Sequence, residues 1–166
     1  IYHTRRCELT AWAAKRKQEE SEWRAQNKEL SLKLNRFLSG EIPEIDYNKI
    51  EVKPDTATRV ASATMLGVYA DKIENMIVAS ADLSNSDRTD GFLNKTKAFM
   101  KGDFTGQFFQ AGVAELTMAC VMNGMALHGG VIPACGTFFV FSDYMKPAIR
   151  LSALMRLKVI YVWSHD

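Results

Sequence analysis

The sequence has few cysteines, little excess charge and no long apolar run. Its 166 residues include three cysteines, with no CxxC pair and no secretory signal, which indicates reduced thiols and a cytoplasmic location. We expect these residues, Cys7, Cys120 and Cys135, to be small buried hydrophobic side chains. Lys and Arg number 21 against 19 Asp and Glu, and the two signs are interleaved, so there is no basic patch for nucleic acid. No apolar stretch reaches the roughly 20 residues that a bilayer-spanning helix needs, so we expect no membrane partner either.

Several common catalytic and metal-binding motifs are also absent. The sequence contains neither the GxxxxGK[ST] loop that binds phosphate nor the GxSxG turn of many hydrolases. The segment "GMALHGG" at residues 124–130 has the glycines of a phosphate loop without its lysine or hydroxyl. Cys120, His128 and Cys135 are irregularly spaced among apolar residues, so we interpret them as structural and predict no metal ligand in this chain.

What is present is the composition of one ordinary folded domain, with 47% hydrophobic and 24% charged residues. The sequence begins with Ile1 and ends directly after an apolar, strand-like run, so we expect a fragment of a longer protein. The composition changes near residue 53. This change predicts the helical end of a preceding domain and a linker over residues 1–53, and a second domain over residues 54–166.

The first of these segments predicts an amphipathic helix over residues 15–40. The stretch "KRKQEESEWRAQNKELSLKLNRFLSG" is rich in helix formers and free of proline. Its larger apolar residues fall on one helical face: Trp23, Leu30, Leu34, Phe37 and Leu38. Ser39 and Gly40 then predict the end of the helix.

The second segment alternates between helical and strand-like patterns. We expect strands at residues 76–80, 131–135 and 158–163, and a short extended piece at residues 107–110. Helices are expected over 58–70, capped by Asp55 or Thr56, from Glu115 onward, and over 138–157, where Pro147 should divide the helix in two. This alternation predicts an α/β fold with a mostly parallel sheet flanked by helices.

Such folds gather their sites at the carboxyl ends of the strands. Predicted strands are followed there by Asp82, the loop before Glu115, Thr137, His165 and Asp166. Glu115 is the only acid in the run "GVAELTMACVMNGMALHGG" at residues 112–130. An acid in the first turn of a helix is favoured by the helix dipole without any catalytic role, so the pattern by itself leaves both interpretations open.

Motifs before and after Glu115 add information on its role. "ATRVAS", "ADLSNSDRTDG" and the whole run from "GVAEL" to "VWSHD" occur in that order. From about Thr56 to Asp166 the sequence closely resembles the pyrimidine-binding domain of transketolase, which binds thiamine diphosphate. Residues 8–51 more loosely resemble the end of the preceding diphosphate-binding domain. The resemblance implies that the domain over 54–166 is incomplete at its C-terminus.

The resemblance implies a role for Glu115 and for an aromatic pocket. In that family the glutamate hydrogen-bonds the aminopyrimidine ring of the cofactor and favours the tautomer that removes the C2 proton. Phe141 is implied to contact the ring, with Phe138 and Tyr144 as walls. Helical spacing alone would make these three aromatics core residues. Asp82 matches an aspartate of the cofactor region.

Substrate-binding residues are implied in the same way. Arg59, Ser86 and His165 match transketolase positions that contact the sugar phosphate, and their donors suit a phosphate dianion. Ala114 and Leu116 depart from the usual Arg and His beside the glutamate. The family's GDG…N motif for diphosphate and metal is absent, because "GDF" at residues 102–104 lacks the second glycine.

The resemblance therefore implies part of a transketolase of the pentose phosphate pathway. Such an enzyme moves a two-carbon ketol unit from a ketose phosphate to an aldose phosphate, as a homodimer with thiamine diphosphate and magnesium or another divalent metal. The metal would be bound by a domain outside this sequence, so we expect the isolated chain to be inactive. Two alternatives are another thiamine diphosphate enzyme, such as deoxyxylulose phosphate synthase or a ketoacid dehydrogenase subunit, and a non-catalytic module that retains the fold. "ADLSNS" and "TFFVFSDY" favour transketolase.

Overall fold

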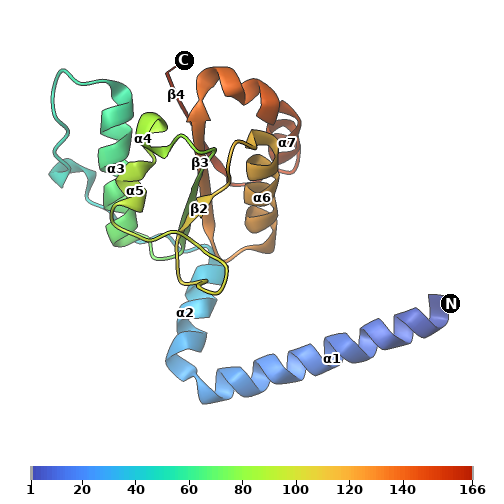
Figure 1. Cartoon of the computed structure of the whole chain (residues 1–166). Helices are drawn as coiled ribbons and strands as arrows, with labels where there is room; N and C mark the ends of the chain where they lie inside the picture. The colour runs from blue at the N-terminus through green and yellow to red at the C-terminus, as the bar shows by residue number, and fades with distance from the viewer. Residues whose placement is uncertain (1, 166) are drawn as a thin grey trace. The chain divides into compact units, whose positions relative to one another are not determined.

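The computed structural model describes residues 2–165 (Figure 1), and the chain divides into two compact units after Ser39. The first unit contains helices α1 (Tyr2–Gln26) and α2 (Lys28–Ser39), neither of which contains a buried residue. The prediction of one continuous helix over 15–40 is wrong at Asn27. The Asn27 side chain donates to the Trp23 carbonyl at 2.9 Å, which is the local competition by which asparagine interrupts helices. The predicted end is confirmed: α2 ends at Ser39, and Gly40 has a left-handed φ of 75°.

The second unit is built on a parallel sheet, which confirms the predicted fold class. Its four strands are β1 (Met76–Ser80), β2 (Phe108–Gln110), β3 (Ile132–Phe138) and β4 (Ile160–Ser164). They lie in the order β2-β1-β3-β4, and every pairing is parallel. Val78 of β1 lies opposite Phe108 and Ala134, so the register brings the carboxyl ends of β1, β2 and β3 to one edge of the sheet.

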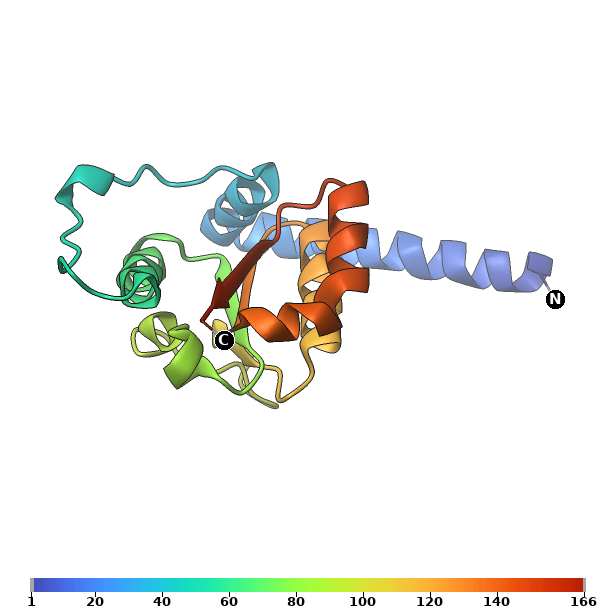
Figure 2. The same ribbon diagram turned by 90° about the horizontal axis from the view of Figure 1, so that it is seen from above.

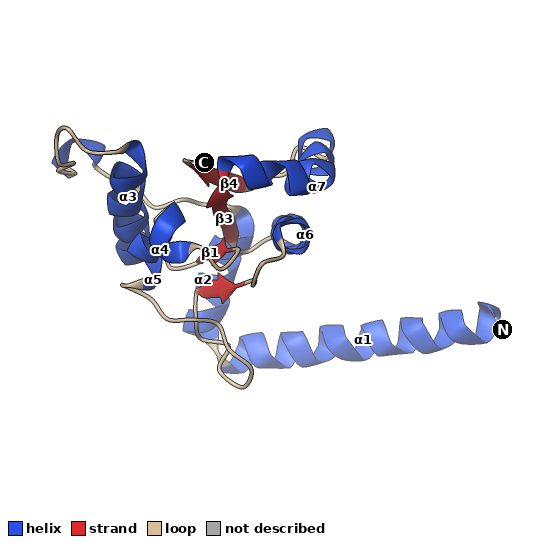
Figure 3. Ribbon diagram, turned by 45° about the horizontal axis from the view of Figure 1, so that its top comes forward, coloured by secondary structure: helices blue, strands red, loops and turns tan. Residues whose placement is uncertain are grey.

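Helices cover both faces of this sheet (Figures 2 and 3). On one side lie α3 (Thr58–Lys72), α4 (Ser84–Asp87) and α5 (Asp90–Leu93), and on the other α6 (Glu115–His128) and α7 (Ser142–Leu154). Two short 3₁₀ turns, η1 (Tyr47–Lys49) and η2 (Phe139–Phe141), complete the unit. The alternating side chains of the strands give a separate core on each face. One core includes Leu66, Val78, Phe92, Phe108 and Ala134, and the other Ala79, Met118, Met122, Cys135 and Met145.

Three local predictions are wrong. Pro147 lies inside α7 without dividing it, because the missing N–H affects only the Asp143 carbonyl, on an exposed residue that water can reach. Helix α3 has Ala57 at its N-cap and no side-chain cap, since the Thr56 hydroxyl donates instead to the Lys53 carbonyl at 3.0 Å. Of the cysteines only Cys135 is buried, where burial raises the pKa of its thiol to about 12, while the other two are exposed.

Candidate functional site

A cavity of about 520 Å³ lies where the N-terminus of α3 meets the carboxyl end of β4. It is lined by Ala57, Thr58, Arg59, Ser62, Asp87, Val162, Trp163, Ser164 and His165. The lining comes from three segments far apart in sequence: the first turns of α3, the end of α4, and β4 with the residue after it. The parallel topology places these segments at the edge where open α/β sheets bind ligands.

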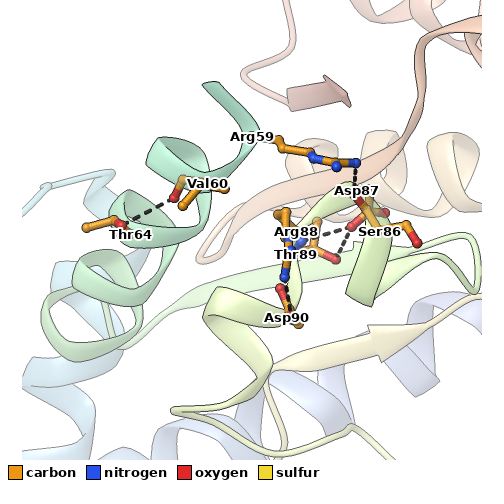
Figure 4. Close-up of polar contacts among 8 residues, drawn as sticks. All are labelled: Arg59, Val60, Thr64, Ser86, Asp87, Arg88, Thr89 and Asp90. Carbon is orange, nitrogen blue, oxygen red and sulfur yellow. Dashed lines mark hydrogen bonds and ion pairs between the residues drawn. The ribbon is translucent and has the colours of Figure 1, made fainter. Parts of the chain in front are cut away.

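Arg59 is the centre of the polar contacts in this cavity. Its Nη1 lies 3.0 Å from Nδ1 and 2.6 Å from Nε2 of His165. The same Nη1 donates to the Ser86 carbonyl at 3.4 Å (Figure 4). The structure thus brings together the three residues predicted to bind substrate. A guanidinium is always charged and carries five N–H donors, so Arg59 has donors left to bind an anion.

A row of aromatic rings begins at the end of β3 and continues into α7. Phe138 and Phe141 stack with ring centroids 5.8 Å apart, and Phe141 and Tyr144 stack at 6.1 Å. The Phe138 ring also meets the His165 ring edge-on at 4.8 Å. The predicted aromatic wall and the Arg59 contacts therefore share one neighbourhood, joined through His165.

Glu115 is the first residue of α6 and is only 7% exposed. Its Oε1 lies 3.5 Å from the hydroxyl of Thr137, a fully buried residue of β3 just before Phe138. The N-cap is Ala114, which supplies no side-chain hydrogen bond to the helix. The carboxyl is thus buried at a helix N-terminus with one long hydrogen bond, beside the strand end that leads into the aromatic row.

Asp82 lies elsewhere, on an exposed turn directly after β1, with a left-handed φ of 65°. No described contact joins it to Arg59 or His165. Asp166 lies outside the described residues. Among residues 2–165 no three His, Cys, Asp or Glu side chains come close enough to hold a metal ion, and no helix there is long and apolar enough to cross a bilayer.

Sequence reasoning missed Asp87, which lines the cavity and is fully buried. Its carboxylate accepts hydrogen bonds from the Ser80 hydroxyl at 2.7 Å and from the Thr89 N–H and hydroxyl, both at 2.8 Å. Burial raises the pKa of Asp87, and these hydrogen bonds offset the rise only in part. The signal in the sequence was the Asp-x-Thr pattern, in which a carboxylate accepts from the N–H two residues on.

Comparison with known sequences finds matches to one protein family. A family profile described as "Transketolase, pyrimidine binding domain" matches residues 55–166. The transketolase of Aquifex aeolicus is 44% identical over 147 residues, which cover 88% of this chain and 21% of that protein. The transketolase of Bacillus subtilis is 41% identical over 158 residues, covering 89% of this chain and 23% of that protein.

Solved structures similar to this chain are also transketolases. Transketolase from Leishmania mexicana superposes with a TM-score of 0.79 at 31% identity, covering 88% of this chain and 22% of that one. Transketolase from Pichia stipitis, in complex with sedoheptulose 7-phosphate, gives a TM-score of 0.76 at 31% identity, covering 88% and 23%. The chain spans about a fifth of the length of these relatives.

Proposed function

The chain belongs to the transketolase family through its match to the pyrimidine-binding domain, and from that premise we propose that it holds the aminopyrimidine ring of thiamine diphosphate. The observation that carries the proposal is Glu115, a buried carboxyl at the head of α6 beside the strand that leads into Phe138. A carboxyl with only one long hydrogen bond to the protein has oxygens left to hydrogen-bond a ring nitrogen.

The residues around Glu115 fit a flat heteroaromatic ring. Phe138, Phe141 and Tyr144 supply stacked faces, and Phe141 is flanked by the other two. When bound, thiamine diphosphate supplies the carbanion equivalent that carries a two-carbon unit. In this proposal Glu115 holds the proton at the pyrimidine nitrogen and Phe141 orients the ring. Asp82 is assigned to the cofactor region by the resemblance alone.

We further propose that Arg59, Ser86 and His165 bind the phosphate of a sugar phosphate. The hydrogen bonds of Arg59 to both of the other residues support this assignment. The reaction proposed is transketolase-type transfer of a ketol unit between sugar phosphates. In this proposal the diphosphate and its divalent metal are bound by a different domain of a cytoplasmic homodimer, as the family resemblance implies. Residues 2–165 contain no group of three His, Cys, Asp or Glu side chains that could hold the metal ion.

The proposal is tested in a chimera in which residues 55–166 replace the matching segment of the Aquifex aeolicus transketolase. We expect this chimera to retain ketol transfer. Arg59→Ala in the chimera should raise KM for phosphorylated sugars by about 10-fold to 150-fold, since a charged hydrogen bond contributes about 1.5–3 kcal/mol.

Two controls make this test specific. KM for an unphosphorylated two-carbon donor should change little in Arg59→Ala. Arg150→Ala, which removes an exposed arginine from α7, should leave both constants unchanged. An equal effect of Arg59→Ala on both substrate classes would assign Arg59 to the fold and contradict the phosphate-binding role.

A further inference from the structure

The segment between β1 and α5 carries Ser86, a residue of the proposed phosphate site, and is tied to the sheet by one buried carboxylate. Asp87, the last residue of α4, has no exposed surface. Its Oδ2 accepts from the hydroxyl of Ser80 at the end of β1, and its Oδ1 accepts twice from Thr89. The Ser80 Oγ also accepts from the Leu83 N–H at 3.2 Å, so the start of the segment is held by the same group.

The backbone on both sides of α4 needs this support. Asp82 and Arg88 have left-handed φ values of 65° and 68°. Each such residue with a side chain costs about 1–2 kcal/mol relative to ordinary backbone. Conformations of this kind persist only where the surroundings fix them. The hydrogen bonds of Asp87 to Ser80 and Thr89 span the α4 turn and supply that constraint.

The opposite side of the Asp87 cluster is packed against β3. A Cβ added at Gly136 would come within 3.2 Å of the Asp87 Oδ2 and within 2.5 Å of the Thr89 Cγ2. The carboxylate therefore has little room to move away from its three donors. Buried polar groups that are fully paired in this way rigidify the structure around them.

We propose that Asp87 is a positioning residue that fixes the Ser86 carbonyl and, through it, holds the Arg59 guanidinium against the His165 ring. Ser86 directly precedes Asp87, and its carbonyl accepts from the Arg59 Nη1 (Figure 4). The importance of this placement for phosphate binding rests on the proposed function. The placement itself depends only on the hydrogen bonds of Asp87 to Ser80 and Thr89 and of Arg59 to the Ser86 carbonyl.

Two substitutions separate the hydrogen bonds from the space that Asp87 fills. Asp87→Leu is similar in size and removes every acceptor. Asp87→Asn keeps an oxygen toward Thr89 and turns its NH₂ toward the Ser80 hydroxyl, which has a lone pair to accept it. Asn should therefore rescue the position and Leu should not.

The test uses the imidazole signals in NMR spectra of the 166-residue chain, which has three histidines. Arg59→Ala defines where the His165 signals lie when the guanidinium is gone. Asp87→Leu should move these signals toward that position, and Asp87→Asn should leave them near their original place. His3, on α1, and His128, the last residue of α6, are internal controls, because neither contacts Arg59 or Asp87, and their signals should not move in any variant.

Two milder variants keep the test decisive if Asp87→Leu fails to fold. Ser80→Ala and Thr89→Val each remove part of the network, and each should give a smaller shift of the His165 signals in the same direction. Unmoved His165 signals in the folded Asp87 or network variants, while Arg59→Ala moves them, would overturn the proposal. Unmoved signals in Arg59→Ala itself would also overturn it. Failure of the proposed function would be seen in a different experiment: KM for phosphorylated sugars would be unchanged by Arg59→Ala in the chimera.

Discussion

The close approach of β3 to the Asp87 cluster predicts that Gly136→Ala destabilises the chain. The new Cβ would lie 2.5 Å from the Thr89 Cγ2, well inside ordinary carbon–carbon contact. Thr89 is fully buried, and its hydroxyl donates to Asp87, so rotating the side chain away would break that hydrogen bond. The contact cannot be relieved by a flexible side-chain end.

The expected size follows from three contributions. Overpacking costs about 1–3 kcal/mol, and weakening one hydrogen bond adds about 0.5–1.5 kcal/mol. Replacing glycine by alanine recovers about 0.5–1 kcal/mol of backbone entropy. We therefore expect the free energy of unfolding to fall by about 0.5–4 kcal/mol, which lowers the urea midpoint by about 1 M for a mid-range value and a typical slope.

Urea titration followed by circular dichroism measures this change in the 166-residue chain. Gly124→Ala is the matched control, because Gly124 lies in α6 with nothing within 4 Å of an added Cβ. It should raise the free energy of unfolding by up to about 1 kcal/mol through helix propensity. If Gly136→Ala proved as stable as Gly124→Ala, the space beside Thr89 would accommodate a methyl group, contrary to this prediction.

Three further predictions concern buried polar groups and the cofactor. Burial raises the pKa of Asp87 above its ordinary 3.8, so the native chain binds this proton more tightly than the unfolded chain. The free energy of unfolding of the parent relative to that of Asp87→Asn should therefore be constant below about pH 3.8 and fall as the pH rises through the native pKa of Asp87. A difference that rises over this range would contradict the raised pKa of Asp87. Tyr161→Phe removes the donor at 2.7 Å from the Asn123 Oδ1 and should cost about 1–3 kcal/mol in thermal or urea unfolding, whereas no loss would show that water replaces it. Calorimetric titration of the 166-residue chain with thiamine diphosphate and magnesium should show no tight binding, because residues 2–165 contain no group of three His, Cys, Asp or Glu side chains that could hold the metal ion. Micromolar binding would contradict a diphosphate site in another domain.

The strands were predictable because they are short apolar runs with clear ends. The bounds expected for β1 are those of the structure, and the expected end of α2 at Ser39 agrees because glycine supplies the left-handed turn. The pairing of Arg59 with Ser86 and His165 spans 27 and 106 residues, and no local pattern encodes it. It was expected only because three separate motifs resemble one family.

The burial of Asp87 could not be predicted from its local sequence. "DRT" at 87–89 and "DFT" at 103–105 form the same local hydrogen bonds, from the threonine N–H and hydroxyl to the aspartate. Asp103 is exposed, and its hydrogen bonds with Lys97 and Thr105 lower its pKa to about 2. Burial raises the pKa of Asp87 instead. The difference comes from the strand packed against Asp87, which is distant in sequence.

Hydrogen–deuterium exchange at the cofactor C2 measures whether Glu115 acts on the pyrimidine ring of thiamine diphosphate. The measurement compares Glu115→Gln with the parent in the Aquifex chimera, with Glu74→Gln on the exposed loop before β1 as the matched control. Removing the acidic proton while keeping the shape should slow exchange by about 10²-fold to 10⁴-fold, with the fold and the control unchanged. Exchange in Glu115→Gln at the rate of the parent would contradict the role assigned to Glu115.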